Sequence, residues 1–333
     1  MAENKLLEVK NLKTYFYTDN GLVKAVDDVS FSLEKGKTLG IVGESGCGKS
    51  ITSLSIMGLV ECPPGKNEGG EILFEGEDLL KKSSDELRKV RGKKIAMIFQ
   101  EPMTSLNPVF TVGQQITEAL KIHEGLDKHA AKEKAIEMLK MVKIPLPERR
   151  FGEYPHQLSG GMRQRVMIAM ALCCNPDLLI CDEPTTALDV TIQAQILNLI
   201  NELKEKSGTS VMMITHDLGV IAEVADDVMV MYAGKVVEQA TTDEIFETPL
   251  HPYTAGLMKC IPKLHENVEE LATIKGMVPS FDDMPKGCAF CPRCEESRKI
   301  CEEQMPGLTD VDGRTVRCFK YEKQYKDLWK EEK

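Results

Sequence analysis

Short apolar runs alternate with helical stretches along most of the chain. Apolar runs bounded by turn residues are typical of buried strands. Strands that alternate with helices predict a mostly parallel sheet with covered faces, an α/β fold. The predicted strands are Leu39–Gly43, Ile72–Phe74, Ile95–Phe99, Leu178–Cys181, Val211–Ile214 and Val228–Met231.

A helical pattern interrupts these strands between about Thr111 and Val142. Apolar residues recur there at intervals that place them on one face of a helix. We interpret this stretch as an inserted helical part, and Ile192–Glu205 as a further helix. The predicted apolar face consists of Ala131, Ala135, Met138, Leu139 and Val142.

The character of the sequence changes after about Leu250. Prolines and cysteines become frequent there, and the hydrophobic periodicity weakens. Such a pattern indicates a small appended domain of irregular structure. We therefore expect two domains, residues 1–250 and residues 251–333.

Composition and charge argue against a nonspecific nucleic-acid-binding protein and against a membrane-spanning or secreted one. Among 333 residues, 52 acidic side chains outnumber 42 basic ones, which gives a net charge of −10. Such an acidic surface disfavours nonspecific binding to nucleic acid. The richest apolar stretch, Val166–Cys174, has nine residues, whereas a membrane-spanning helix needs roughly 20. The N-terminus lacks the apolar segment of a secretory signal, so we expect a cytosolic chain.

A glycine-rich motif indicates nucleotide chemistry. It follows the predicted strand Leu39–Gly43 and precedes a predicted helix, Ile51–Met57, as a phosphate-binding loop requires. Glycines let backbone N–H groups converge on phosphate oxygens. The lysine contacts the β- and γ-phosphates, and the last serine offers a hydroxyl to Mg²⁺. The loop residues are Gly43, Glu44, Ser45, Gly46, Cys47, Gly48, Lys49 and Ser50.

Two acidic residues follow the predicted strand Leu178–Cys181. Asp182 can hold Mg²⁺ directly or through water, and Glu183 can polarise an attacking water molecule. Such a pair is by itself common on protein surfaces. Together with a phosphate loop, it predicts hydrolysis of a nucleotide.

The segment Leu158-Ser-Gly-Gly-Met-Arg-Gln-Arg165 resembles the signature of the ATP-binding-cassette (ABC) ATPases. The order of the motifs matches that family over about residues 5–250. The resemblance implies a cassette with a mostly parallel sheet, an antiparallel β part and a helical subdomain at about 101–157. The other matching motifs are Phe99-Gln100 (Q-loop), Ala187-Leu-Asp189 (D-loop) and Thr215-His216-Asp217 (switch histidine).

The resemblance also implies roles for single residues. Gln100 would touch Mg²⁺ and the attacking water, and His216 would contact the γ-phosphate. Phe16 sits where the family stacks an aromatic ring on adenine, although its neighbours Tyr15 and Tyr17 keep that choice open.

The signature implies a second cassette. A helix that begins at Ser159, Gly160 and Gly161 offers N–H groups to a phosphate. In this family, that phosphate belongs to ATP on the other subunit's phosphate loop, and Asp189 of the D-loop lies at the same interface. The resemblance therefore implies a head-to-tail dimer, identical or paralogous, with ATP between its subunits.

Two further segments resemble the ATPases of oligopeptide and dipeptide permeases. They are Gln100-Glu-Pro-Met-Thr-Ser-Leu-Asn-Pro108 and His251-Pro-Tyr-Thr254. This resemblance implies a peripheral subunit on the cytoplasmic face of the membrane, with two permease subunits as partners. An extracellular binding protein would act indirectly. Related ATPases serve nickel or sugar importers, so the cargo stays open.

Five cysteines lie within 31 residues near the C-terminus. In a reducing compartment, such a window indicates metal ligands rather than disulfides. Spacing alone does not separate an iron–sulfur cluster from Zn²⁺ or from unligated thiols. The family resemblance favours a [4Fe–4S] cluster, with Zn²⁺ as the alternative. The expected ligands are Cys288, Cys294, Cys301 and Cys318, while Cys291 is an additional candidate that could replace one of the first two.

A soluble ABC ATPase that acts on nucleic acid or the ribosome is the competing hypothesis. Repair and chromosome-maintenance members carry long coiled coils between the two ATP motifs. Here Lys49 and Asp182 are only 133 positions apart, without sustained heptads. The single cassette and the acidic charge also disfavour this class.

Overall fold

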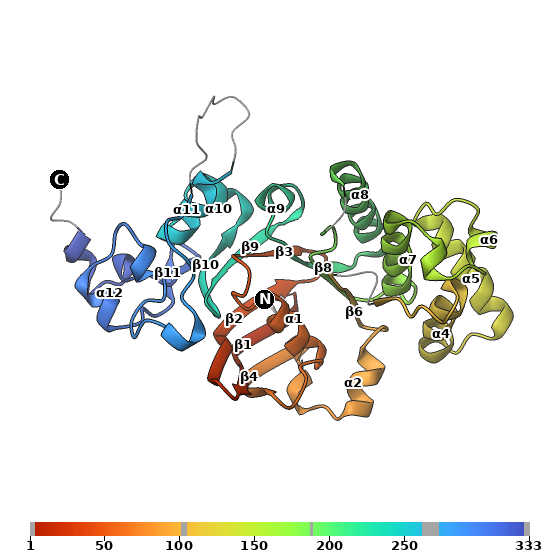
Figure 1. Ribbon diagram of the computed structural model, residues 1–333, viewed down its shortest axis with the longest axis horizontal. Coiled ribbons are helices and arrows are strands. Elements are labelled where there is room, and N and C mark those ends of the chain that lie inside the picture. The colour runs from red at the N-terminus through yellow and green to blue at the C-terminus, as the bar shows by residue number, and fades with distance from the viewer. Residues whose placement is uncertain (1–3, 101–104, 187–188, 262–272, 330–333) are drawn as a thin grey trace. The chain divides into compact units, whose positions relative to one another are not determined.

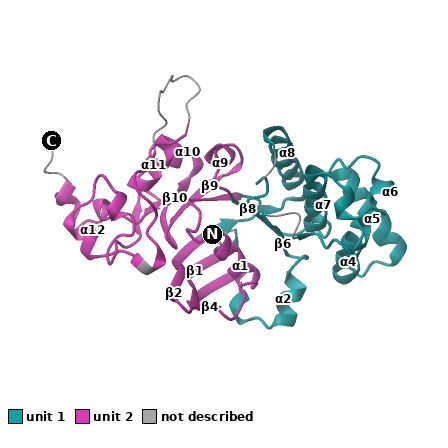
Figure 2. Ribbon diagram, in the orientation of Figure 1, with its two compact units in different colours: residues 1–6, 33–37, 79–214 teal, residues 7–32, 38–78, 215–333 magenta. Residues whose placement is uncertain are grey.

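The structure is a computed structural model that describes residues 4–100, 105–186, 189–261 and 273–329 (Figure 1). The predicted D-loop residues Ala187 and Leu188 therefore lie outside the described residues. Two compact units make up the chain (Figure 2). The first comprises residues 1–6, 33–37 and 79–214, and the second comprises residues 7–32, 38–78 and 215–333. Within the described ranges, no helix is both long and apolar enough to cross a bilayer.

A parallel sheet forms the core of the first unit. The strands β6 (Ile95–Ile98), β7 (Leu178–Asp182) and β8 (Ser210–Ile214) lie side by side in that order. Every residue of these strands is buried, as expected for the interior of a parallel sheet. The predicted parallel, covered sheet is confirmed here.

Helices of the first unit form the inserted part. The helical pattern from 111 to 142 folds as two helices, because Gly125 adopts φ 65° and ends the first, while Asp127 caps the second. The predicted apolar face on the second helix is buried, as expected. The helices of this unit are α2 (Ser84–Val90), α4 (Val112–Glu124), α5 (Lys128–Met141), α6 (Pro147–Arg150), α7 (Gly160–Leu172) and α8 (Val190–Ser207), with 3₁₀ turns η1 (Leu79–Lys81) and η2 (Pro155–Gln157).

The second unit contains the antiparallel part, a sheet with the strand order β2-β1-β4-β5. Leu7 lies opposite Phe74, and Phe16 lies opposite Gly65. Alternating buried and partly exposed positions hide these strands from a search for apolar runs, so only residues 72–74 were predicted. The bounds are β1 (Lys5–Thr18), β2 (Gly21–Glu34), β4 (Gly65–Phe74) and β5 (Glu77–Asp78).

A second sheet of the same unit holds the strand that leads into the phosphate loop. β3 (Thr38–Val42) pairs with β9 (Asp227–Tyr232) in parallel, and β10 (Lys235–Thr241) continues the sheet antiparallel. A C-terminal hairpin extends this sheet: β12 (Arg314–Val316) pairs with β10, and β11 (Thr309–Val311) pairs with β12. Residues far along the chain thereby join the sheet that carries β3.

The rest of the second unit is helical or irregular. Most elements after residue 260 are short, as the weak periodicity predicts. Its helices are α1 (Lys49–Met57), α9 (Leu218–Val224), α10 (Thr242–Glu247), α11 (Pro252–Lys259) and α12 (Lys299–Glu303), with 3₁₀ turns η3 (Phe281–Asp283), η4 (Cys291–Arg293), η5 (Phe319–Tyr321) and η6 (Lys326–Trp329).

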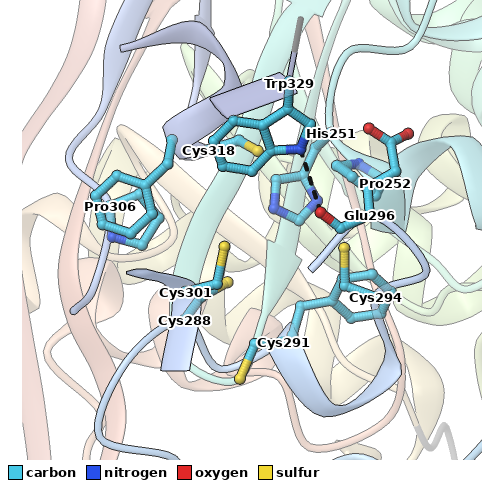
Figure 3. Close-up of a pocket in the computed structure, with 12 residues that line it drawn as sticks. His251, Pro252, Cys288, Cys291, Cys294, Glu296, Cys301, Pro306, Cys318 and Trp329 are labelled. Carbon is cyan, nitrogen blue, oxygen red and sulfur yellow. Dashed lines mark hydrogen bonds between the residues drawn. The ribbon is translucent and has the colours of Figure 1, made fainter. Parts of the chain in front are cut away.

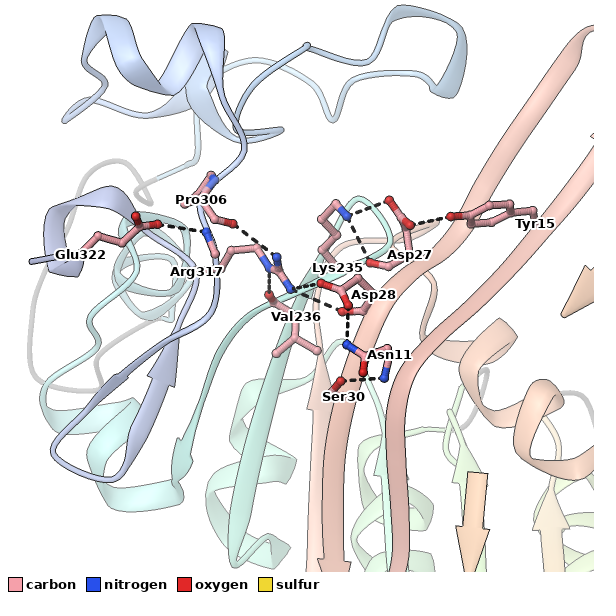
Figure 4. Close-up of polar contacts among 11 residues, drawn as sticks. Asn11, Tyr15, Asp27, Asp28, Ser30, Lys235, Val236, Pro306, Arg317 and Glu322 are labelled. Atoms are coloured by element: carbon pink, nitrogen blue, oxygen red, sulfur yellow. Dashed lines mark hydrogen bonds and ion pairs between the residues drawn. The ribbon is translucent and has the colours of Figure 1, made fainter. Parts of the chain in front are cut away.

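Arg317 ties the C-terminal hairpin to the antiparallel sheet (Figure 4). Its buried guanidinium donates to the carbonyl oxygens of Val236 and Pro306 at 3.0 and 3.3 Å. It also reaches the carboxylate of Asp28 at 3.2 Å, while the amide of Asn11 donates to the other oxygen of Asp28 at 2.8 Å. A buried cation is thus satisfied by several acceptors, as burial of charge requires.

Candidate functional site

The phosphate loop joins β3 to α1 in the second unit. Gly43, Gly46 and Gly48 have φ of 153°, 78° and 104°, a region that side chains rarely adopt. A Cβ atom on Gly48 would collide with the carbonyl oxygen of Ala25. The glycines of the motif are therefore required by the backbone path, and the predicted strand–loop–helix context is present.

Lys49 begins α1, where the N-terminal end of the helix carries partial positive charge. Its ammonium group donates to the carbonyl oxygens of Gly43 at 2.8 Å and Glu44 at 3.1 Å. The side chain is buried within its own loop. The lysine thus binds the carbonyl oxygens of the same loop that we expect to bind a phosphate.

Cys47 lies inside this loop and is 1% exposed. Burial raises the pKa of the Cys47 thiol, and the nearby ammonium of Lys49 does not offset burial. The neutral, buried thiol of Cys47 thus fills space in the loop. This agrees with the interpretation that any small residue suits this position.

The aromatic residues near the end of β1 point in different directions. Phe16 shares a strand face with Thr14, whose hydroxyl lies 2.8 Å from that of Ser55 on α1. Tyr15 donates to Asp27 and Tyr17 donates to Glu68, both at 2.7 Å. Both tyrosine hydroxyls are thus engaged in hydrogen bonds, and Phe16 lies on the strand face that meets the phosphate-loop helix. This geometry favours Phe16 as the adenine-stacking residue, which stays a prediction.

His216 is exposed at the start of the loop before α9. Thr215 is buried and its hydroxyl accepts the N–H of Asp217 at 3.0 Å. Asp217 in turn caps α9 by accepting from Gly219 and Val220. Its two neighbours therefore fix the backbone that presents His216.

The acidic pair lies at the carboxyl end of β7 in the first unit. Asp182 is the buried last residue of the strand, and Glu183 has φ 46°. One carboxylate oxygen of Glu183 accepts from the Gln100 amide at 3.0 Å and from the Thr186 hydroxyl at 2.9 Å. The structure thus brings Gln100 and Glu183 together and adds Thr186, a contact that sequence reasoning missed; the roles of Gln100 and Glu183 stay predictions.

The signature begins α7, also in the first unit. Ser159 caps this helix by accepting the N–H of Met162 at 3.4 Å, and Ser159 and Gly160 are exposed. A Cβ atom on Gly161 would stand 3.1 Å from Ile192 of α8. Gln164 is buried and donates to the carbonyl oxygen of Pro184 at 2.6 Å. Gln164 therefore links the signature helix to the residue that follows Glu183, a contact that spacing does not reveal.

Asp189 caps α8 and accepts the N–H of Ile192 at 3.0 Å. Since Ile192 also lies against Gly161, the first turns of α7 and α8 meet. The predicted D-loop aspartate therefore has a structural role in addition to any role at an interface.

Five cysteines line one cavity of the second unit, and we call four of them, Cys288, Cys294, Cys301 and Cys318, the cysteine ring (Figure 3). The sulfur of Cys291 is turned away from the space between Cys294, Cys301 and Cys318. This orientation favours the four predicted ligands over Cys291. Within the described residues, no three His, Cys, Asp or Glu side chains are placed to hold a single metal ion.

Burial raises the pKa of Cys288 and Cys318 to about 12 and that of Cys294 to about 11, and the neighbouring thiols add to this effect. These three thiols are therefore protonated at neutral pH. His251 also lines the cavity, but its Nδ1 accepts the N–H of Tyr253 at 3.1 Å and so caps α11.

Two residues of the C-terminal region contact the phosphate loop, and sequence reasoning missed both. Arg293 binds the carboxylate of Glu44 through two nitrogens, at 2.8 and 3.0 Å. The hydroxyl of Tyr253 accepts the N–H of Glu44 at 3.0 Å. Two sequence features could have pointed to them: Tyr253 belongs to the His-Pro-Tyr segment, and Arg293 directly precedes Cys294.

Comparison with known proteins identifies two family regions. Residues 26–186 match the ABC transporter family, and residues 237–301 match the oligopeptide/dipeptide transporter C-terminal region. The first match contains the phosphate loop, Gln100, the signature and Glu183. The second contains the His-Pro-Tyr segment and all but one residue of the cysteine ring.

Similar curated proteins match along nearly the whole chain. The oligopeptide transport ATP-binding protein AppD of Bacillus subtilis (strain 168) is 56% identical, over 96% of this chain and 98% of that protein. OppD of the same organism is 57% identical over 92% and 86%. The dipeptide transport ATP-binding protein DppD of that organism is 54% identical over 95% and 94%.

Solved structures give the same family. The dimeric bacterial ABC transporter cassette MJ0796 is 31% identical, with a TM-score of 0.63, and the match covers 71% of this chain and 98% of that one. A dimeric post-hydrolysis state of that cassette, bound to ADP and Pi, matches equally well. With its phosphate loop, signature and Glu183 in place, the chain belongs to the ABC ATPase family, among the oligopeptide and dipeptide transport ATP-binding proteins.

Proposed function

We propose that this chain is the ATP-hydrolysing subunit of an importer for dipeptides or oligopeptides. The observation that carries the proposal is the joint presence of a complete set of cassette motifs and of the oligopeptide/dipeptide C-terminal region on one chain. Relatives that match from end to end are transport ATP-binding proteins, which disfavours an ATPase of nucleic acid or the ribosome.

Hydrolysis needs a base, a charge stabiliser and a phosphate cradle. Glu183 polarises the attacking water, and Gln100 and Thr186 orient its carboxylate. Lys49 and the loop N–H groups hold the phosphates, and His216 stabilises charge at the γ-phosphate.

The residues expected to hold magnesium have suitable donor chemistry. Ser50, Gln100 and Asp182 each offer an oxygen ligand, the donor that Mg²⁺ prefers. When bound, Mg²⁺ neutralises charge on the phosphates. Asp182 is buried as the last residue of β7, at the carboxyl end of the strand.

A second cassette completes the site. Ser159 and Gly160 are exposed at the positive end of α7, so their N–H groups can meet a phosphate held by another subunit. The dimeric structures of a 31% identical cassette support this arrangement. The partner cassette is an identical or a paralogous chain.

The chain acts at the cytoplasmic face of the membrane, held there by two permease subunits that contact the helical subdomain at about residues 101–157. An extracellular binding protein delivers the cargo to those permeases. Nickel or sugar importers use related ATPases, and the cargo is chosen by partner subunits. Affinity purification of the chain with its permeases and binding protein, followed by mass spectrometry of the bound ligand, tests the cargo. Recovery of peptides supports the proposal, and recovery of nickel or a sugar contradicts it.

The cysteine ring holds a [4Fe–4S] cluster in this proposal, with Zn²⁺ as the alternative. The support is the chemistry of the donors: five cysteines line the cavity, and thiolates are the ligands that both centres use. The centre would fix a chain segment whose elements are too short to form a core of their own. Visible absorbance with iron, sulfide and zinc analysis of anaerobically purified protein tests this. A brown protein with four irons supports the cluster, and a colourless protein with stoichiometric zinc overturns it.

A further inference from the structure

Glu44, the second residue of the phosphate loop, is held at three points. Lys49 donates to its carbonyl oxygen at 3.1 Å, and the Tyr253 hydroxyl accepts its N–H at 3.0 Å. Arg293 binds both oxygens of its carboxylate. Two of the three contacts come from beyond residue 250, in the same compact unit.

The Arg293 side chain is buried, and each of its guanidinium N–H groups has an acceptor. Its side chain is 5% exposed, and besides Glu44 it donates to the hydroxyl of Tyr232 at 3.3 Å. Its remaining N–H groups reach the carbonyl oxygens of Lys275 and Ile274 at 3.0 and 3.4 Å. All five guanidinium N–H groups are therefore accounted for, so the geometry of the fork is fixed.

Aromatic rings hold both contacting residues in place. The rings of Tyr232, Tyr253 and Phe290 pack together, with centroids 4.7 to 5.3 Å apart. The Arg293 guanidinium lies 5.8 Å from the ring of Tyr232 and 5.9 Å from that of Phe290. Phe290 also lines the cavity of the cysteine ring, and Arg293 lies directly before Cys294.

We propose that Arg293 and Tyr253 are positioning residues for ATP, which hold the phosphate loop in its binding conformation and neutralise the carboxylate of Glu44. Lys49 must turn toward the phosphates when ATP binds, which loosens its hold on Glu44. Arg293 and Tyr253 keep that residue fixed at this moment. Without Arg293, an unpaired carboxylate would stand beside the polyphosphate and repel it. The cysteine-rich region is then part of the nucleotide site.

The test measures the dissociation constant of a fluorescent N-methylanthraniloyl ATP with Mg²⁺, on the full chain purified anaerobically. Arg293→Ala should weaken binding about 10-fold or more, equivalent to about 1.4 kcal/mol. Arg293→Lys, which keeps the charge but loses the fork, should recover part of the loss. The matched control is Arg314→Ala, because Arg314 lies in the same region but donates to Thr248. Wild-type affinity in Arg293→Ala, or an equal loss in Arg314→Ala, overturns the proposal.

A double-mutant cycle tests whether Arg293 affects ATP affinity through Glu44 or through a general loss of structure. If Arg293 acts through Glu44, then Arg293→Ala with Glu44→Gln binds ATP no more weakly than Arg293→Ala alone. If the loss of ATP affinity in the double variant equals the product of the losses in the two single variants, the proposal is overturned. If Arg293→Ala does not fold, Tyr253→Phe tests the second contact, since it removes only the hydroxyl. A several-fold weaker affinity supports the proposal, and an unchanged one overturns it. These measurements use the chain alone, so they succeed or fail independently of the proposed peptide cargo.

Discussion

At the residue scale, the backbone and the side chain of Glu183, the proposed general base, are both held in place. Its φ of 46° is uncommon for a side chain of this kind, and such strain persists only where the surroundings hold it. Its N–H donates to the carbonyl oxygen of Ile214 at 2.9 Å, and Gln100 and Thr186 fix its carboxylate. The backbone and the side chain are thus both preset for one orientation.

Glu183→Gln should keep Mg²⁺–ATP binding and lose ATP turnover. The amide retains the shape of the side chain but cannot act as a general base, so we expect turnover to fall by about 100-fold or more. Steady-state hydrolysis and equilibrium ATP binding measure the two effects. Glu205→Gln on an exposed position of α8 serves as the control. Undiminished turnover in Glu183→Gln would remove this residue from its role.

Asp27 makes stability depend on acid pH. Burial alone would raise the pKa of Asp27, but hydrogen bonds from Lys235 and Tyr15, each at 2.7 Å, outweigh burial and hold the pKa below its ordinary value. A carboxyl with a lowered pKa stabilises the fold fully above its unfolded pKa, near 3.8, and this contribution is lost as pH falls from there through the lower pKa of the folded state.

Asp27→Asn should therefore lower the free energy of unfolding by about 2 kcal/mol at neutral pH, because charged hydrogen bonds are lost. The difference from wild type should stay constant from about pH 7 to 5 and shrink below about pH 4. Urea unfolding at a series of pH values measures it. A difference that is the same at all pH values would contradict this assignment.

At the element scale, hydrophobic periodicity predicted the strands and helix faces whose apolar residues are regularly spaced. The buried parallel strands β6, β7 and β8 and the apolar face of α5 follow directly from apolar spacing. The break between α4 and α5 depends on the positive φ of Gly125 and the cap at Asp127, which a count of apolar residues overlooks. The long strands β1 and β2 were missed because exposed residues alternate with buried ones.

The C-terminal hairpin depends on one buried arginine. Arg317→Ala removes the donor to one oxygen of the Asp28 carboxylate and to two carbonyl oxygens, so we expect a loss of about 3 kcal/mol in the free energy of unfolding. Thermal and urea unfolding measure this loss. Lys299→Ala is the control, since its side chain is 88% exposed and should change stability little. Equal stability of the two variants would show that Arg317 does not hold the hairpin.

At the scale of the whole molecule, the sequence motifs predicted the chemistry but not its supports. Each motif is local, so short patterns were enough to predict roles for Lys49 and Glu183, and a family resemblance to predict one for Gln100. Arg293 meets Glu44 across 249 positions of sequence, and Tyr253 meets it across 209. No local pattern encodes such contacts, because only the packed tertiary structure brings these residues together.

The two compact units carry different parts of the predicted ATP chemistry. One unit carries the phosphate loop, His216 and the cysteine ring, while the other carries Gln100, Glu183 and the signature. In the proposed transporter, the signature of one chain completes the phosphate site of another. ATP use is then tied to the meeting of two cassettes, and through them to the permeases.

Uptake of a labelled peptide into proteoliposomes tests this account most directly. The vesicles contain the two permeases and the cassettes, with the binding protein outside and ATP supplied on the cassette side. We predict ATP-dependent accumulation with the wild-type chain and its loss with Glu183→Gln, with both transporters assembled to the same extent. Uptake without ATP hydrolysis, or equal uptake with Glu183→Gln, would contradict the account.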